Sequence, residues 1–295
     1  MEIRQLTYFV KAAELLHFTE AAAAVYITQS TLSQQIKLLE QELGMPLFDR
    51  LGKHVRLTEA GKVFLSHARK ILLNVEKGRQ AIADLNNMVT GELRIGVTYA
   101  FTSMILPVLP EFTKRFPTLK INLEYGAPEI LEHKLKESEL DLILAFHNQD
   151  NDPELELQPL SKSNIVLVVA KHNKLAKLKK ISLKEILNLN LILPAKGFSS
   201  RNFVDELFEQ HKIIPSIRME LNDMHSLLSL VQHGEQVSII NEKALLGWNE
   251  LVAVPIIGNR LSRQSYIIWH RGAYRKKAAE LFADELLKIG NAAHN

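Results

Sequence analysis

The sequence changes character near Thr90 and Gly91, and this change limits the folds that the chain can adopt. Before it, nearly all apolar residues follow helical spacing, apart from a short segment around 46–57. After it, short runs rich in Val, Ile and Leu alternate with helical patterns. Strands that alternate with helices predict an α/β fold with largely parallel sheets, divided between two lobes. We expect strands at 92–97, 120–125, 140–146, 165–170, 191–194, 217–221, 237–240 and 265–269, and helices at 103–115, 128–137, 199–211, 224–234 and 272–289.

Length and composition narrow the class of protein further. The 295 residues fit two domains at roughly 100–200 residues each. There is no cysteine, which excludes disulfides, thiolate metal sites and a cysteine nucleophile. The N-terminus mixes charged with apolar residues, and no run of apolar residues is long enough for a transmembrane helix. We therefore expect a cytoplasmic protein.

The sequence carries none of the common catalytic signatures. It has no G-x-S-x-G elbow, no P-loop, no G-x-G-x-x-G and no H-E-x-x-H. The 11 histidines show no spacing that would hold a metal ion. We expect a protein that is not an enzyme and needs no cofactor.

The first 44 residues predict a helix-turn-helix. Apolar residues at helical spacing cover 3–15, a short alanine-rich helix covers about 18–25, and a third helix runs over 29–43 and ends at Gly44. The polar face of the third helix carries the residue types that read base edges in the major groove. An alternative is a small helical bundle with a solvated polar face. If the face binds DNA, the contacting residues are Thr28, Gln29, Ser30, Thr31, Ser33, Gln34 and Lys37.

A basic hairpin follows the third helix. Residues 46–58 are expected to form two short strands around a glycine turn, with Arg50, Lys53, His54 and Arg56 and no acid within 50–56. Beside a helix-turn-helix, this is typical of a wing that contacts phosphates or the minor groove. We expect Arg50, Lys53 and His54 to contact DNA. Residues 1–58 nevertheless hold six Lys and Arg and six Asp and Glu, so their formal net charge is zero. DNA binding by this module would therefore depend on where its basic residues lie and not on an excess of them.

The stretch "FTEAAAAVYITQSTLSQQIKLLEQELGMPLFDRLGKHVRLTEAG" resembles the DNA-binding domain of LysR-type transcriptional regulators. The similarity covers more than 40 residues without a gap. It departs from the family at Leu16 and His17, where a glycine or small residue followed by Ser is common. The resemblance implies a bacterial winged helix-turn-helix over 1–58 that binds a double-stranded DNA operator.

Residues 58–89 predict one long helix with Thr58 as its N-cap. Its apolar residues are spaced 4, 3, 4, 3, 4, 3 and 4 apart, as in a coiled coil. In the resembled family this linker helix, expected at 59–89, pairs with a second subunit, and the family usually forms tetramers that bend DNA. An alternative is a helix packed on its own C-terminal domain. The predicted dimer contacts are Phe64, Ala68, Ile71, Val75, Ile82 and Leu85.

Residues 92–295 resemble the effector-binding domain of the same family, which has the two-lobed α/β fold of periplasmic binding proteins. The matching pieces are "LPVLPEFTKRFPTLKINLEYG", "LKESELDLILA" and "LLSLVQHGEQVSIIN". A Pro-bearing turn usually follows the last of them, whereas Asn241, Glu242 and Lys243 follow here. The resemblance places lobe I at 92–162 and 268–295 and lobe II at 163–267, with the chain crossing near Lys162 and near 266–268.

Two turns suit a small anionic effector between the lobes. Residues 98–103 and 196–201 both offer hydroxyls and backbone N–H groups at the start of a helix. Arg201 could clamp a carboxylate, and Phe146 and His147 end a strand that faces the same cleft. Simple helix capping by Ser and Thr is the alternative. The expected effector contacts are Thr98, Tyr99, Thr102, Ser103, Phe146, His147, Ser199, Ser200 and Arg201.

Three classes of protein therefore compete: a ligand-responsive transcription factor, a small-molecule-binding protein or enzyme whose helices only oligomerise it, and an architectural DNA-binding protein without ligand response. The polar face of the third helix disfavours the second class, and the two turns disfavour the third. The expected partners are operator DNA, a small effector, a second copy of the chain in a dimer of dimers, and RNA polymerase, with no membrane. A basic run at 171–180 is interpreted as a solvated loop and short helix, with a second DNA contact as its alternative.

Overall fold

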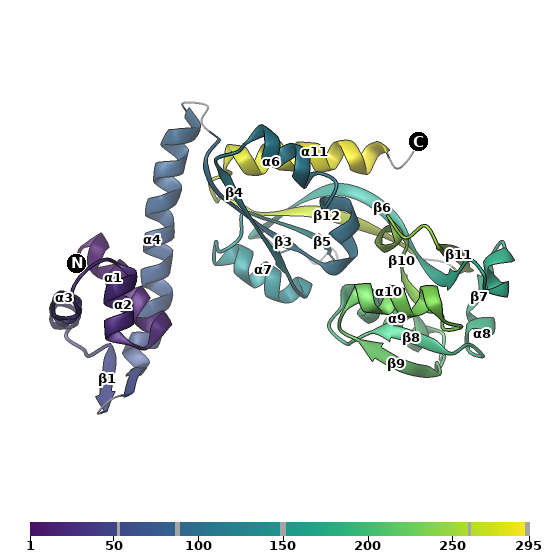
Figure 1. The fold of residues 1–295 in the computed structure, drawn as a ribbon, viewed down its shortest axis with the longest axis horizontal. Helices are drawn as coiled ribbons and strands as arrows, with labels where there is room; N and C mark the ends of the chain where they lie inside the picture. Colours follow the sequence, from purple (N-terminus) through teal and green to yellow (C-terminus); the bar gives the residue numbers. More distant parts are fainter. Residues whose placement is uncertain (52–53, 86–88, 148–151, 259–260, 293–295) are drawn as a thin grey trace. The chain divides into compact units, whose positions relative to one another are not determined.

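The computed structural model describes residues 1–51, 54–85, 89–147, 152–258 and 261–292, with the side chains of 50–54 and 291–292 left out. The chain forms two compact units, Met1–Asn86 and Asn87–Asn295. Each unit is described by itself (Figure 1). No helix among the described residues is long and apolar enough to cross a membrane.

The N-terminal unit has the predicted helices and hairpin. Its elements are α1 (Ile3–Leu15), α2 (Phe18–Ala24), α3 (Gln29–Leu43), β1 (Phe48–Leu51), β2 (His54–Leu57) and α4 (Glu59–Leu85). Four phenylalanines join them: the Phe9 ring lies 5.5 Å from Phe48 and 5.3 Å from Phe64, and Phe18 lies 5.3 Å from Phe48. The core therefore ties the hairpin to both α1 and α4.

Gly44 and Thr58 lie at the helix ends where the sequence predicts them, and Thr28 is a further cap, at the start of α3. The Thr28 hydroxyl accepts a hydrogen bond from the Thr31 N–H at the start of α3, and Gly44 ends the helix with φ 72°. The Thr58 hydroxyl accepts from the Gly61 N–H at 2.9 Å. These caps fix where the helices begin.

The C-terminal unit is built on one eight-stranded sheet and a two-stranded sheet. The central order is β4-β3-β5-β12-β6-β11-β7, with β10 also paired to β6. The strands are β3 (Gly91–Val97), β4 (Leu119–Tyr125), β5 (Leu142–Phe146), β6 (Leu155–Ala170), β7 (Ile181–Ser182), β10 (Ser238–Asn241), β11 (Leu251–Ile257) and β12 (Ser262–His270), and β8 (Leu191–Pro194) pairs with β9 (Ile217–Leu221).

The prediction of largely parallel sheets is wrong for the middle of this unit. Strands β3, β4 and β5 are parallel, as are β8 and β9, but β6 pairs antiparallel with β10, β11 and β12. Strand β6 is 16 residues long, and only its second half has the continuous apolar pattern that identifies a buried strand. Strand β11 was not predicted, because Pro255 interrupts its apolar run.

Helices cover the sheets of two lobes, which we define by their cores. In lobe I, α6 (Leu109–Arg115) and α11 (Lys277–Ala292) pack on one face of β3-β5, and α7 (Pro128–Lys136) packs on the other (Figure 1). In lobe II, α9 (Ser199–Gln210) and α10 (Met224–His233) belong to two further buried clusters. The helix predicted at 103–115 is broken into α5 (Thr102–Ile105) and α6, since Pro107 cannot donate an interior helix hydrogen bond; η1 (Tyr99–Phe101) precedes them, and Pro110 lies in the first turn of α6.

Strands β6 and β12 pass through both lobes as an antiparallel pair. Their register shifts between Ser265 and Tyr266. At this point the Ser265 hydroxyl donates to the Ser161 carbonyl at 2.8 Å, and the two hydroxyls lie 3.0 Å apart. The irregularity bends the pair where the chain leaves one lobe for the other.

Candidate functional site

The start of α3 presents a polar, exposed surface. The Thr28 hydroxyl lies 2.9 Å from that of Ser30 and 2.8 Å from that of Thr31, and the Gln29 amide donates to the Ser33 hydroxyl. These contacts hold the short side chains in place without burying them. Among the predicted DNA contacts, Ser33 is half-buried and the exposed ones are Thr28, Gln29, Ser30, Thr31, Gln34 and Lys37.

The hairpin is anchored to α3 by one carboxylate. Oε1 of Glu40 accepts hydrogen bonds from the backbone N–H groups of Leu47 and Phe48, at 2.8 and 3.2 Å. The predicted contacts Arg50, Lys53 and His54 lie outside the described side chains.

Tyr26 is an exposed residue that is not among the DNA contacts predicted from the sequence. It sits between α2 and α3 with φ 57° and is 96% exposed. A large aromatic side chain beside a polar helix start is a further candidate for contact with a partner. Its position in the predicted break between helices was the only available signal.

The apolar residues along α4 fall into two groups, one packed in the N-terminal core and one exposed to solvent. Ala68 is fully buried in the N-terminal core, and Phe64 and Ile71 pack against that core. Val75 is half-buried, whereas Ile82 and Leu85 are 63% and 79% exposed. The structure therefore uses the first half of the seam inside its own unit.

In the C-terminal unit, an aromatic stack brings the two predicted turns together. The Tyr99 ring stacks on Tyr125 at 5.3 Å within lobe I and on Phe198 of lobe II at 4.7 Å. The hydroxyls around it already have partners: Thr98 donates to the Leu144 carbonyl and Thr102 to the Tyr99 carbonyl. Ser103 donates across the lobes to the Lys243 carbonyl at 2.5 Å.

Arg201 is engaged within its own lobe. Its side chain is 4% exposed and makes ion pairs of 2.8 Å with both Asp205 and Glu220, besides donating to the Pro194 carbonyl. Burial alone would lower the pKa of Arg201, but the hydrogen bonds that its guanidinium donates to the two carboxylates raise it. The contacts with Pro194 and Glu220 hold α9 to β8 and β9, and the contact with Asp205 lies within α9, so Arg201 is engaged in packing its own lobe.

A different arginine lies between the lobes. Arg263 of β12 is stacked at 4.3 Å from the Phe146 ring and 4.9 Å from the Phe203 ring, and donates to the Ser199 carbonyl at 2.9 Å. Among the described residues, no carboxylate oxygen lies within 4 Å of its guanidinium. Burial lowers the pKa of Arg263 to about 10, against the weaker attraction of Glu206. A desolvated cation without a paired carboxylate is an unusual arrangement that an anionic ligand would complete.

Arg263 opens into a polar cavity of about 260 Å³. Lobe I contributes Phe146 and His147, and lobe II contributes Ser199 and Asn202. His147 is held by Glu132, with 2.9 Å between Nδ1 and Oε1. Of the nine predicted effector contacts, this cavity brings together Phe146, His147 and Ser199. The full lining is Pro128, Glu129, Glu132, Phe146, His147, Ser199, Asn202, Phe203, Glu206 and Arg263.

Comparison with known proteins decides the family. Residues 3–62 match the bacterial regulatory helix-turn-helix proteins of the lysR family, and residues 86–289 match the LysR substrate binding domain. The chain is a LysR-type transcriptional regulator. The resemblance seen in the sequence is thereby confirmed, as is the fold class of an N-terminal helix-turn-helix with an α/β effector domain.

Full-length relatives of this LysR-type regulator are also named as regulators. It is 30% identical over 283 residues to YybE of Bacillus subtilis, an uncharacterized HTH-type transcriptional regulator, covering 96% of this chain and 97% of that protein. It is 28% identical to the HTH-type transcriptional activator CmpR of Synechocystis, covering 96% and 94%. Among solved structures, full-length OxyR of Pseudomonas aeruginosa has the same fold, with 24% identity, a TM-score of 0.73 and coverage of 97% and 94%.

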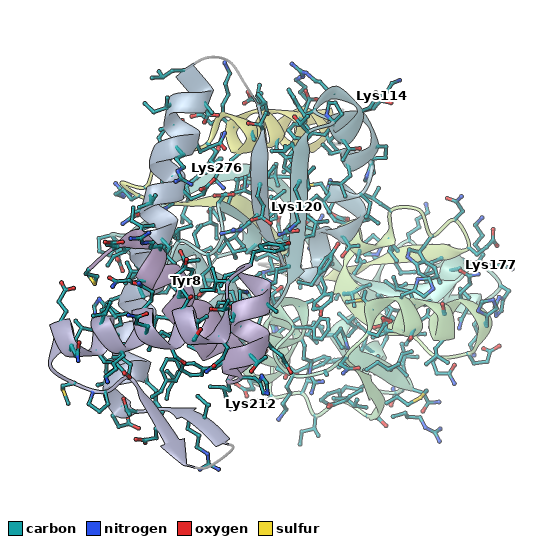
Figure 2. All side chains as sticks on the ribbon, turned by 60° about the vertical axis from the view of Figure 1, so that its left-hand side comes forward. Tyr8, Lys114, Lys120, Lys177, Lys212 and Lys276 are labelled. Carbon is teal, nitrogen blue, oxygen red and sulfur yellow. The ribbon has the colours of Figure 1, made fainter. Side chains whose placement is uncertain are left out.

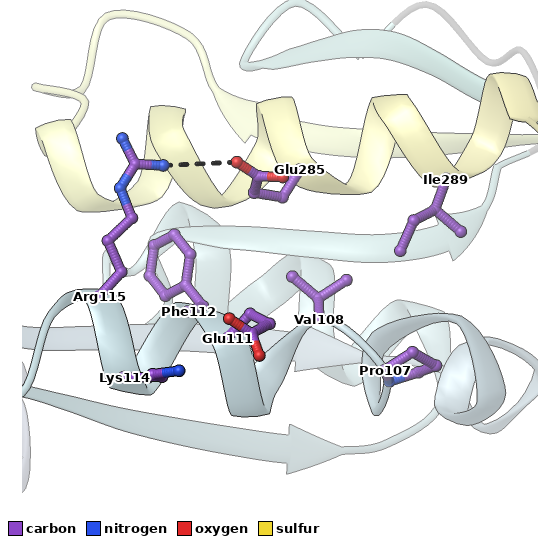
Figure 3. A pocket seen from close by; sticks show the side chains of 8 residues that line it. All are labelled: Pro107, Val108, Glu111, Phe112, Lys114, Arg115, Glu285 and Ile289. Carbon is purple, nitrogen blue, oxygen red and sulfur yellow. Dashed lines mark ion pairs between the residues drawn. The ribbon is translucent and has the colours of Figure 1, made fainter.

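The effector domain of the regulator has further hollows outside the Arg263 cavity. One lies between α6 and α11 of lobe I (Figure 3), where Val108, Phe112 and Ile289 form the floor and Arg115 pairs with Glu285 at 3.5 Å on the rim. Another lies beside the aromatic stack and is mainly apolar, with Tyr99 and Trp248 among its walls. Lys114 also lines the first hollow, but its side chain is exposed to solvent, whereas Arg263 is partly buried between two aromatic rings.

Proposed function

We propose that this regulator binds a double-stranded operator as a homodimer, assembled as a dimer of dimers, and responds to a small anionic effector held at Arg263. The observation behind this proposal is the Arg263 guanidinium, which is partly buried between the lobes and touches two aromatic faces and one carbonyl. A carboxylate is the natural partner of such a group, because it can accept two parallel N–H bonds.

The DNA-binding part of the proposal rests on α3. Gln29, Ser30, Thr31, Ser33 and Gln34 would face base edges in the major groove, while Thr28, Lys37, Arg50, Lys53 and His54 would contact the phosphates or the minor groove. The structure of the relative CbnR complexed with its target DNA shares the fold, with a TM-score of 0.71. Binding of DNA by the present chain is inferred from that likeness and from the exposure of α3.

The effector part extends from Arg263 to its neighbours. His147, Ser199 and Asn202 offer polar groups in the same cavity, and Glu129, Glu132 and Glu206 on its lining disfavour a ligand with spread negative charge. The effector class that fits best is therefore a compact carboxylate with hydroxyl groups. The effector domain of the relative QuiR is described in complex with shikimate, a molecule of that class.

The remaining predicted contacts would act as cleft walls. Tyr99 joins the lobes through its ring, and Thr98, Thr102 and Ser103 shape the turn beneath it. Ser200 and Arg201 would position α9 rather than contact the ligand. A ligand changes the lobe arrangement only if it binds one arrangement more tightly than the other.

We propose that the chain has no catalytic activity and works in the cytoplasm, where bacterial chromosomal DNA lies. Its named relatives are transcriptional regulators. RNA polymerase would be a further partner, as activation of transcription requires.

A thermal-unfolding screen of small carboxylates and their neutral amides tests the effector proposal. A carboxylate should raise the unfolding temperature of the wild-type protein, whereas its amide and the R263M variant should show no shift. Saturating ligand at 100 times Kd stabilises by about 2.7 kcal/mol, which is readily measured. An equal shift in wild type and R263M would contradict the assignment of Arg263.

A further inference from the structure

A dense run of lysines lies in lobe II and plays no part in the function proposed above. Residues 171–184 contain six lysines and no aspartate or glutamate, whereas the whole chain has a net charge of only +3. Residues 1–58 are formally neutral. We call the surface formed by Lys174, Lys177, Lys179 and Lys180 the lysine face.

The packing of this segment turns its lysines outward. Ile181, Leu183 and Ile186 are buried in the lobe II core, and Leu175 packs against it. These anchors leave the intervening lysines in solvent, and Figure 2 shows Lys177 at the outer edge of the unit. All four lysines of the face are exposed.

The face lacks neutralising carboxylates among the described residues. Lys171 pairs with Glu250 at 3.2 Å, and Glu185 is engaged in capping Ser182. No described residue forms an ion pair with Lys174, Lys177, Lys179 or Lys180. Four unpaired lysines within seven residues repel one another, and a polyanion would relieve that repulsion.

We propose that the lysine face binds the phosphate backbone of duplex DNA and supplies sequence-independent affinity beyond that of residues 1–58, whose formal charge is zero. The proposal rests on the proposed function only in that α3 binds DNA. Lysine carries a point charge suited to phosphates, and the face contains no aromatic or amide side chain that would read bases.

The test measures the salt dependence of binding between the full chain and a random-sequence duplex, from about 50 to 200 mM KCl. The slope of log K against log salt changes by about 0.9 for each phosphate contact. The K174Q/K177Q/K179Q/K180Q variant should therefore reduce the slope by about 2–4. The matching set of arginine substitutions should preserve the slope, since the charge remains.

The matched control, K114Q/K120Q/K162Q/K212Q, removes the same charge from other exposed positions of the same unit; Figure 2 labels three of them. It should leave the slope nearly unchanged. An unchanged slope in the lysine-face variant would overturn the proposal and leave an acidic protein as the partner of the face. An equal fall in both variants would also overturn it. The preference for operator over random DNA should persist in the lysine-face variant, and its loss would instead concern α3.

Discussion

Arg201 and Arg263, 62 residues apart in sequence, show which part of the candidate effector site can be predicted from sequence and which part cannot. The sequence directs attention to Arg201, because it follows two serines at a helix start. The structure pairs Arg201 with Asp205 and Glu220 and leaves Arg263 beside the cavity. The partners of Arg263 come from β5 and α9, so no local pattern could have brought them together.

The two arginines should differ in their contribution to stability. R201M should lower the free energy of unfolding by about 2–4 kcal/mol, because it leaves two carboxylates without their cation. R263M should leave the stability of the unliganded protein unchanged or raise it by about 1 kcal/mol, since it removes a desolvated charge. The cost of that charge is fully present at pH 7 and is relieved only as the pH rises through about 10. Denaturant unfolding measures both, and a large loss in R263M would contradict the account.

Gly61 allows α4 to approach the hairpin. A Cβ atom there would lie 2.1 Å from the Leu47 carbonyl oxygen, which is backbone and cannot move aside. G61A should therefore destabilise the protein by about 1–3 kcal/mol. G78A is the control in the same helix: nothing lies within 4 Å of its Cβ position, so it should stabilise by up to about 1 kcal/mol. Equal effects of the two substitutions on the unfolding temperature would argue against the close approach.

Substitution of Gln34 tests whether α3 makes sequence-specific contacts with DNA bases. It is exposed on the polar face of α3, and its amide can bond two atoms of an adenine. Q34A should cost about 1–3 kcal/mol on a fragment that the regulator selects from its own genome, but little on random DNA. Q41A, exposed nearer the end of the same helix, is the control. An equal loss on both kinds of DNA would exclude a role in specificity.

At the scale of elements, α4 shows both the success and the limit of periodicity. The helix and its N-cap were predicted, but the heptad spacing cannot tell which partner each residue meets. Ala68 packs inside its own unit, whereas Ile82 and Leu85 stay exposed. Likewise, local patterns located β3, β4, β8 and β9, but the direction of β6 and β12 depends on pairing between distant segments.

The exposed half of α4 should carry the dimer contact. We expect I82D/L85D to yield monomers in analytical ultracentrifugation, because charges on an apolar seam are desolvated on association. The folding of the N-terminal unit should be retained, since neither side chain belongs to its core. A68D should instead unfold that unit. Persistent dimers of the double variant would reject this interface.

For the whole molecule, the long strands β6 and β12 make the two lobes one unit. The register shift beside Ser161 and Ser265 lies where both strands change lobes, and Arg263 lies two residues from it in the same strand. A ligand that recruits Arg263 would therefore act next to the bend of the connection. The family resemblance predicted two lobes and two points where the chain crosses between them. The structure shows in addition that the two crossing segments, β6 and β12, pair with each other as antiparallel strands.

We expect a ligand bound at Arg263 to change the contacts that the regulator makes with DNA. The most direct measurement is a DNase I footprint on a genomic fragment that the full chain selects. It is recorded with and without the carboxylate that most raises the unfolding temperature. The account predicts that the ligand alters the length or pattern of protection for the wild-type protein and leaves that of R263M unchanged. An identical ligand effect in both proteins, or no effect on a wild-type protein shown to bind the ligand, would contradict it.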